Sequence, residues 1–323
     1  MDQLSKIEDN LFFIVGCGRS GTTLLKTILN AHPNVTIPHE TFFFNNIAKR
    51  LESSSSSLED KLKLISSRWW IQAMGVTAQG LEESLESREP SPRNLFLALL
   101  KETSDQSKTL HYGEKTVAHI QSAEELLSEF PRCRVIQIIR DPRAAFASFK
   151  LAKVGTNQVA PLIFDWDRAM KVDEKLAGHE RYSTVKFESL ILNTEETIKQ
   201  VCEQLRIPFD KQMLNFHSRS DKGFSAVQDH HKNTTKPIFA TGLKKWKSVL
   251  SPSHKGLIEL HLGEQMAARG YELVGDKVSF PAVRMKVSWF FHEIWKWCVG
   301  RPRAQLKKLR ARRQNRKQVN LIK

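Results

Sequence analysis

The residues most suited to chemistry form a glycine-rich segment near the start of the chain, Gly16-Cys-Gly-Arg-Ser-Gly-Thr-Thr23. Its glycines let the backbone curl, so that successive N–H groups and the start of a following helix point at one anion. The segment has the G-x-x-x-x-G frame of a nucleotide-binding phosphate loop, but Thr22 stands where that motif requires lysine. The cation is instead Arg19, earlier in the loop. The sequence therefore predicts a phosphate cradle whose charge layout does not suit ATP hydrolysis.

A second set of anion-binding residues follows the hydrophobic stretch 134–139. Arg140 stands where a magnesium-dependent phosphate-loop enzyme has an aspartate ligand. Open α/β sheets bind ligands at the carboxyl ends of their strands, so we expect Arg140 to face an anion there. Ser148, about two helical turns later, is expected to add a hydroxyl, and Asp141 to cap the next helix through backbone N–H groups. A surface ion pair is the alternative for Arg140.

The elements that must position these residues alternate between strand and helix patterns. Short apolar or β-branched runs predict strands at 11–15, 35–37, 109–112, 134–139 and 182–187. Helical spacing is found at 24–30, after Pro142, and at 194–205. This alternation predicts an α/β fold, a three-layer sandwich with a central parallel sheet.

The net charge of the 323-residue chain is +15, but most of it lies at one end. Residues 281–323 hold thirteen Lys and Arg and one acid, Glu293, a net charge of +12 that leaves +3 for the first 280 residues. Such a nearly neutral body argues against nucleic acid as the partner. We therefore expect one domain at 1–280, in which the polar, helical region 45–108 is a lid or insertion, and a separate basic tail.

The tail, residues 281–323, combines two features. Apolar residues recur at helical spacing, at Val283, Val287, Phe290, Phe291, Ile294 and Cys298. A basic cluster, 301–317, follows them. An aromatic-rich amphipathic helix followed by basic residues is typical of a segment that binds an anionic membrane surface. The alternatives are a helix packed on the body with a solvated end, or contact with RNA or an acidic polysaccharide.

The cellular compartment is predicted from what the sequence lacks. It has no apolar stretch of the roughly 20 residues that a spanning helix needs, and its first residues do not follow the layout of a signal peptide. The four cysteines are scattered singly, without a CxxC pair, which favours reduced thiols. We expect a cytoplasmic protein, peripheral at the membrane if the tail binds there.

Two motifs, in this order, resemble the sulfotransferase family. FFIVGCGRSGTTLLKTILNAHPNV is similar to the family's 5′-phosphosulfate loop, and IIRDPRAAFASF to its 3′-phosphate site. The resemblance continues through YSTVKFESLILNTEETIKQVCEQLRIPF to TGLKKW, the family's late G-x-x-x-W loop, and so covers about 11–271. It implies the phosphate-loop-NTPase-like sulfotransferase fold and the donor 3′-phosphoadenosine 5′-phosphosulfate (PAPS). No metal is expected, since no cluster with metal-ligand spacing is found in the sequence.

The resemblance also implies which residues hold the donor. The 5′-phosphosulfate would be held by Gly18, Arg19, Ser20, Gly21, Thr22 and Thr23. The 3′-phosphate would be held by Arg140 and Ser148. The sequence departs from the family at Phe187, where the Y-E-x-L segment has a tyrosine, so any contact made by that hydroxyl is lost.

AHPNVTIPHETFFF most resembles the tyrosylprotein and carbohydrate branches, which implies that Glu40 is the catalytic base. A base is needed because the acceptor hydroxyl must lose its proton as it attacks sulfur. The same resemblance implies that Lys115 steadies the sulfonate or the bridging oxygen. His39 is a weaker candidate base, and His119 lies two residues too far along for the lysine–histidine pattern of the small-molecule branch. A helix-start role for Glu40 and a solvated Lys115 are the alternatives.

Together these features predict a sulfotransferase that moves a sulfonate group from PAPS to a hydroxyl. The acceptor class stays open between a carbohydrate, a lipid, a peptide tyrosine and a small molecule. Arg19, Glu40 and Lys115 would be the catalytic residues. The alternatives are a phosphate-loop kinase, and an inactive nucleotide-binding scaffold associated with a membrane.

Overall fold

The computed structural model describes residues 2–52, 57–152, 158–218 and 242–275. Within the chain, Met1–Val249 and Leu250–Lys323 form two compact units. The residues predicted to do chemistry all belong to the first unit. The basic tail, and with it the predicted domain boundary after residue 280, lies outside the described residues, so both stay predictions.

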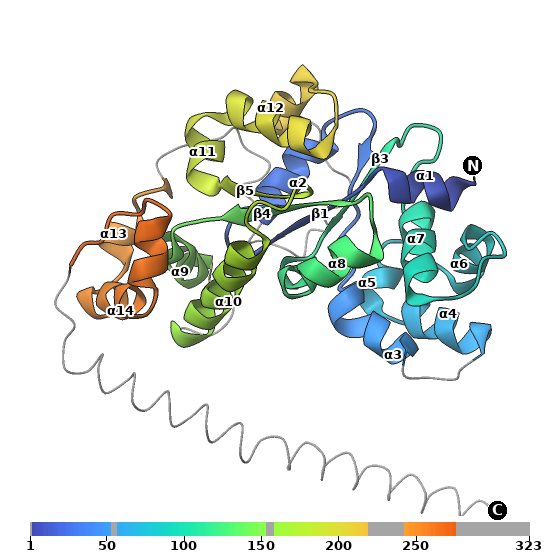
Figure 1. The fold of residues 1–323 in the computed structure, drawn as a ribbon, viewed down its shortest axis with the longest axis horizontal. Coiled ribbons are helices and arrows are strands. Elements are labelled where there is room, and N and C mark those ends of the chain that lie inside the picture. The colour runs from blue at the N-terminus through green and yellow to red at the C-terminus, as the bar shows by residue number, and fades with distance from the viewer. Residues whose placement is uncertain (1, 53–56, 153–157, 219–241, 276–323) are drawn as a thin grey trace, which may run out of the picture. The chain divides into compact units, whose positions relative to one another are not determined.

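A five-stranded sheet forms the centre of the first unit (Figure 1). Its strands are β1 (Leu11–Gly16), β2 (Val35–Thr36), β3 (His111–Lys115), β4 (Arg134–Ile139) and β5 (Tyr182–Lys186). Their order is β2-β3-β1-β4-β5, and every neighbouring pair is parallel. All residues of β1 are buried, as expected for a central strand covered on both faces. The predicted α/β fold with a central parallel sheet is confirmed.

The register of the sheet brings the ends of three strands together. Lys115 of β3 pairs with Ile14 of β1, and Ile138 of β4 pairs with Gly16. One strand prediction is wrong, because β3 starts at His111 and ends at Lys115 instead of covering 109–112. Pairing with β1 continues as far as Lys115, and this tertiary contact overrides the low strand propensity of the polar residues there.

Helices cover both faces of the sheet (Figure 1). One side carries α2 (Thr22–Asn30), α11 (Phe187–Leu192) and α12 (Thr194–Leu205); the other carries α8 (Ala123–Glu129), α9 (Pro142–Ala152) and α10 (Ala160–Leu176). The described residues of this unit also form α1 (Gln3–Asp9), α3 (Ala48–Glu52), α4 (Leu58–Ser66), α5 (Trp69–Gln72), α6 (Ala78–Ser84), α7 (Pro92–Glu102) and α13 (Trp246–Val249). The second unit contains α14 (Pro252–Ala268). The three layers match the predicted sandwich.

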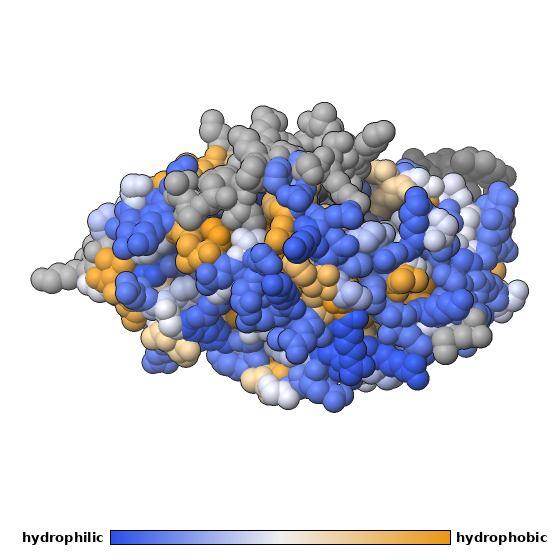
Figure 2. Space-filling model, turned by 90° about the horizontal axis from the view of Figure 1, so that it is seen from above, coloured by the Kyte–Doolittle hydropathy of each residue, from blue (hydrophilic) through white to orange (hydrophobic). Residues whose placement is uncertain are grey.

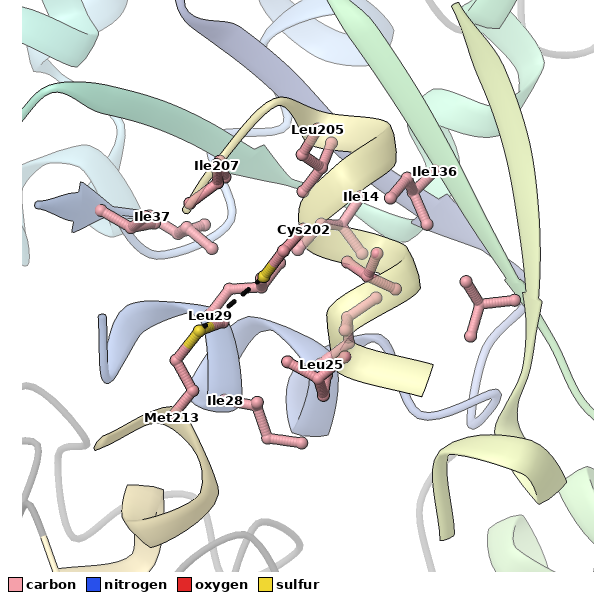
Figure 3. Packing of buried hydrophobic residues seen from close by; sticks show 14 of the residues in the cluster. Ile14, Leu25, Ile28, Leu29, Ile37, Ile136, Cys202, Leu205, Ile207 and Met213 are labelled. Carbon is pink, nitrogen blue, oxygen red and sulfur yellow. Dashed lines mark hydrogen bonds between the residues drawn. The ribbon is translucent and has the colours of Figure 1, made fainter. Parts of the chain in front are cut away.

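The packing between the sheet and α2 fixes the start of that helix (Figure 3). Leu25, Ile28 and Leu29 recur at helical spacing on the face of α2 that packs against the sheet. Cys202 of α12, a helix on the same side of the sheet, belongs to this cluster, with its Sγ 3.8 Å from the sulfur of Met213. Burial of this cluster, at about 25 cal/mol per Å² of apolar surface, holds α2 and the loop before it against β1.

The region predicted as a lid or insertion, 45–108, is largely helical where the structure describes it, from the end of a π-helical turn at Phe43–Ile47 through α3 to α7. Its last helix, α7, has six consecutive buried residues, Leu95 to Leu100. Phe96 stacks on Phe13 of β1, with the ring centroids 5.8 Å apart. This helix therefore supports the sheet from one face. A lid role for the region stays a prediction.

The surface seen from above is mainly hydrophilic where it is coloured in Figure 2, with hydrophobic residues in several separate patches. Among the residues that the structure describes, no helix combines the length and apolar character needed to cross a membrane.

Candidate active site

The glycine-rich loop occupies the junction between β1 and α2, as predicted. Arg19 and Gly21 both have positive φ angles, 64° and 101°, which lets the chain reverse before the helix begins at Thr22. A Cβ atom at Gly21 would lie 2.3 Å from the ring of Phe187. One at Gly16 would lie 2.6 Å from the carbonyl oxygen of Ile138. The loop is therefore pressed so closely against its neighbours that only glycine fits at these two positions.

Ser20 is the residue of this loop that indicates a ligand most directly. Its side chain is fully buried, and its Oγ has no hydrogen-bond partner among the residues that the structure describes. A buried hydroxyl without a partner costs about 1–3 kcal/mol, so such groups are rare unless something else satisfies them. An anion held by the loop would supply the missing oxygen. The residues present therefore fit the predicted phosphate cradle.

Three predicted anion-binding residues from distant segments meet at this loop. Arg19 donates from Nε to Ser148 Oγ at 3.2 Å. Arg140 donates from Nη1 to the carbonyl oxygen of Arg19 at 3.0 Å. Burial lowers the pKa of the Arg19 guanidinium from its ordinary value, although a guanidinium stays charged at neutral pH. Two positive charges thus lie at the loop that contains the buried Ser20 hydroxyl.

Phe187, which stands where the sulfotransferase family has a tyrosine, contacts both the loop and Arg140. Its ring contacts the loop at Gly21, and the Arg140 guanidinium carbon lies 4.3 Å from the ring centroid. A cation over an aromatic face is attracted by about 0.5–2 kcal/mol. The departure from the family therefore removes a hydroxyl but keeps the flat surface on which Arg140 rests.

Asp141 caps α9, as predicted. Its Oδ1 accepts from the backbone N–H of Arg143 at 2.9 Å, and its Oδ2 pairs with the Arg143 guanidinium at 2.8 Å. Arg143 also lies 4.0 Å from the ring of Trp246, in the predicted G-x-x-x-W loop. Glu188 accepts a hydrogen bond from the backbone N–H of Asp141 at 3.1 Å, and burial raises the pKa of its carboxyl. These contacts fix the direction in which Arg140 leaves β4.

Glu40 and Lys115 are brought together at the other side of the loop. Lys115 is the last residue of β3, and its Nζ donates to Glu40 Oε1. The lysine side chain is 7% exposed and the glutamate side chain 28% exposed. Lys115 is therefore not the solvated lysine of the alternative reading. The half-buried carboxylate remains within reach of solvent, as an acceptor substrate would require.

His119 is excluded as a base by its contacts. It is fully buried; its Nδ1 lies 2.7 Å from Glu114 Oε2, and its Nε2 accepts from the backbone N–H of Phe44 at 3.2 Å. Both ring nitrogens are thus occupied within the protein. Glu114, which the sequence argument did not single out, is the centre of this buried group. The signal that could have identified it is a carboxylate next to Lys115 at the end of a strand that lies in the sheet.

Other predicted residues are placed less specifically. Thr22 and Thr23 form the first turn of α2, where N–H groups point toward the loop. His39 precedes Glu40 in the chain and stays the second candidate base. The resemblance to sulfotransferases also implies a basic loop near the 3′-phosphate, and its loose candidates, Lys232 and Lys236, lie outside the described residues.

Comparison with known sequences places these features in one family. Residues 12–211 match the sequence model of the sulfotransferase family. Protein-tyrosine sulfotransferase A of Caenorhabditis elegans is 27% identical over 245 residues, which are 72% of this chain and 60% of that protein. Protein-tyrosine sulfotransferase 1 of Danio rerio is 25% identical over 73% of this chain and 65% of that protein. The chain thus spans less than two thirds of the length of these relatives.

Solved structures share the fold. The sulfotransferase domain of the Synechococcus PCC 7002 olefin synthase matches with a TM-score of 0.58 at 22% identity, over 81% of this chain and 95% of that one. The sulfotransferase domain of the curacin biosynthetic pathway matches with a TM-score of 0.56 at 20% identity, over 81% and 98%. At these identities the likeness concerns the fold alone.

Proposed function

The chain belongs to the sulfotransferase family, and from that premise we propose that it transfers a sulfonate group from PAPS to the hydroxyl of an acceptor. The observation that carries the proposal is the buried Ser20 hydroxyl, which lacks a partner among the described residues. It lies in the loop that contains Arg19 and that Arg140 contacts. A kinase would need a metal-binding carboxylate at the end of β4, where this chain has Arg140.

The donor would be held by two groups of residues. The loop N–H groups, with Arg19, Ser20 and the start of α2, suit the 5′-phosphosulfate. Arg140 and Ser148 suit the 3′-phosphate, because a guanidinium and a hydroxyl together supply the donors that a phosphate accepts. The Arg19–Ser148 hydrogen bond supports this assignment, since it places the two groups next to each other.

The transfer itself is a displacement at sulfur. The acceptor oxygen forms a new S–O bond, and the bond between sulfur and the bridging phosphate oxygen breaks, with its electron pair leaving on adenosine 3′,5′-bisphosphate. Glu40 takes the acceptor proton as general base. Arg19, Lys115 and the loop N–H groups stabilise the negative charge that develops on the sulfonate and the leaving oxygen.

The ion pair between Glu40 and Lys115 links proton transfer to charge stabilisation. In the free protein the two charges neutralise each other. When Glu40 takes a proton it becomes neutral, and Lys115 loses its counter-charge. Glu40 is protonated while negative charge develops on the leaving oxygen. The Lys115 ammonium group is then available to stabilise that charge.

The acceptor is proposed only as a hydroxyl compound. The relatives named protein-tyrosine sulfotransferases make a peptide tyrosine the first acceptor to test, followed by carbohydrates, lipids and small phenols. Contact of the tail with an anionic membrane, and a cytoplasmic location, stay predictions.

Calorimetry with adenosine 3′,5′-bisphosphate and ATP tests the donor site. The proposal expects the bisphosphate to bind far more tightly, and equal affinity for the two nucleotides would refute it. Radiolabelled PAPS supplied with peptides, glycans and lipids then tests transfer. A labelled product establishes the activity, whereas bisphosphate binding without any product, across acceptors of all four classes, favours the inactive scaffold.

A further inference from the structure

The segment after Glu40 has an unfavourable backbone. Phe42 has φ 49°, in the left-handed region that bulky side chains rarely adopt, and a π-helical turn follows at Phe43–Ile47. Such a conformation is unfavourable in isolation and persists only where surrounding contacts fix it. The contacts that hold residues 41–44 therefore also decide where Glu40 lies.

These contacts come from the end of β3 and the turn after it. The backbone N–H of Thr41 donates to Glu114 Oε1 at 3.3 Å, and that of Phe42 donates to Thr116 Oγ1 at 3.2 Å. The N–H of Phe44 donates to His119 Nε2 at 3.2 Å. Three N–H groups of one short segment thus bind three side chains that lie more than 70 residues away in the sequence.

The Glu114 carboxylate joins these side chains into one network. It is fully buried and accepts from Thr41 Oγ1 at 2.9 Å, Thr116 Oγ1 at 2.5 Å and the His119 ring. With the Thr41 N–H it has four donors, about as many as a carboxylate can accept. Because His119 Nε2 accepts from a backbone N–H, the ring proton belongs on Nδ1, facing Glu114.

The charge of Glu114 suits this role. Burial alone would raise its pKa, but the contacts with His119, Thr116 and Thr41 outweigh burial and hold the pKa below the usual value. The group therefore stays an ionised acceptor, and every donor around it keeps one defined direction. A fully satisfied buried network of this kind specifies a single arrangement of the segments that it joins.

We propose that Glu114, Thr41 and His119 are positioning residues that hold Glu40 against Lys115. Glu114 and Lys115 are neighbours in β3 and point to opposite faces of the strand. Thr41 binds Glu114 and Glu40 binds Lys115. The segment 40–41 therefore contacts both faces of the end of the strand. None of the three residues needs to touch a substrate. The inference rests on the proposed function in so far as Glu40 and Lys115 do the chemistry.

Amine labelling of the full chain with acetic anhydride, read residue by residue by mass spectrometry, tests the positioning directly. Lys115 is protected in the original protein by burial and by Glu40. Glu40→Gln sets the reference for a broken pair, with Lys115 labelled about tenfold faster because a charge-assisted hydrogen bond is lost. Thr41→Val removes the hydroxyl at constant volume, and we expect labelling about three- to tenfold faster.

Matched controls separate positioning from general loosening. Thr41→Ser keeps the hydroxyl and should leave Lys115 labelling within about twofold of the original. Lys26, buried in α2, should label at the original rate in every variant. In Glu114→Gln an amide N–H would face the N–H of His119, and two donors cannot form a hydrogen bond. Lys115 labelling in this variant should therefore rise as in Thr41→Val. If that variant does not fold, the Thr41 pair decides.

The proposal is overturned if Lys115 labelling is unchanged in Thr41→Val, or if Lys26 labelling rises equally. The measurement uses neither donor nor acceptor. Failure here therefore leaves bisphosphate binding untouched, whereas loss of the proposed function would appear as absent bisphosphate binding with Lys115 protection intact.

Discussion

The two sides of the candidate site are built in opposite ways. The donor half, residues 16–23 with Arg140 and Ser148, holds two cations and a buried hydroxyl that has no partner among the described residues. The base half, residues 40–44 and 114–119, pairs its charges and fills its hydrogen bonds within the chain. One half is complete only with an anion, and the other is complete by itself.

This difference predicts different responses to mutation. A change in the donor half should act mainly on ligand binding, because its two cations and the Ser20 hydroxyl would bind the donor. A change in the base half should act on rate or on the stability of the free protein, because its contacts are already present. If mutations in the two halves change ligand binding, rate and stability in the same way, the two halves do not differ as described.

The largest effect is expected for Glu40→Gln. The amide is nearly isosteric but a poor base, so turnover with PAPS and an identified acceptor should fall by about 10²–10⁴-fold. Affinity for adenosine 3′,5′-bisphosphate, measured by calorimetry, should stay within about twofold. His39→Ala is the control and should keep most of the activity. Normal turnover in Glu40→Gln with a dead His39→Ala would move the base to His39.

Arg140→Ala should weaken binding of the bisphosphate about ten- to a hundredfold, since a charge-assisted contact contributes about 1.5–3 kcal/mol. Arg134, at the opposite end of β4, supplies the matched control. Arg134→Ala removes the same charge from the same strand and should change affinity less than about twofold. Equal losses in both variants would mean that net charge, and not a site at the end of β4, binds the nucleotide.

Removal of a buried hydroxyl should have opposite effects in the two halves. Ser20→Ala deletes a hydroxyl that has no partner among the described residues. The free protein should therefore become more stable by about 1 kcal/mol, while bisphosphate affinity falls by about threefold to tenfold. Thr41→Val deletes a satisfied hydroxyl and should lower the free energy of unfolding by about 1–3 kcal/mol. Denaturant unfolding with and without the bisphosphate measures both, and a destabilised Ser20→Ala contradicts the comparison.

The smallest effect concerns Glu188, beside the donor half. Burial raises its pKa in the folded protein, so the ionised carboxyl makes folding less favourable above that pKa, and the penalty disappears as pH falls below the ordinary glutamate range. Glu188→Gln imitates the protonated group and keeps an oxygen for the N–H of Asp141. Its Tm should exceed that of the original protein by a few degrees at most at pH 7, and by nothing near pH 4. A Tm difference that does not change with pH would contradict this assignment.

The donor half was predictable from the sequence because each part of it is local. A hydrophobic run, a glycine-rich turn and a helix pattern follow one another from Leu11 to Asn30, and Arg140 comes directly after an apolar strand. Each signal fits within one strand–turn–helix unit. The contact between Arg19 and Ser148 was not predictable in detail, but both residues had been assigned to one ligand.

The base half was predictable only in part. Glu40 and Lys115 were identified by resemblance, yet their partners lie more than 70 residues apart and meet only because β2 and β3 are neighbours in the sheet. The sequence predicts the strand at 109–112, which leaves Glu114 outside it, whereas β3 extends from His111 to Lys115. His119 was weighed by its spacing from Lys115, whereas the turn at Val117–Ser122 carries it back to Glu114. The positions of these residues follow from the pairing of strands in the sheet, which residue spacing does not reveal.

The strand order has a consequence for how the molecule assembles in time. β1 precedes the other four strands along the chain, yet both of its neighbours in the sheet come late: β3 starts at His111 and β4 at Arg134. Pairing of such distant segments requires closure of long loops, which slows folding. The glycine-rich loop can therefore reach its final shape only after the chain has been synthesised past residue 139. A nascent chain cut short before β4 should lack nucleotide affinity altogether, whatever the quality of its loop.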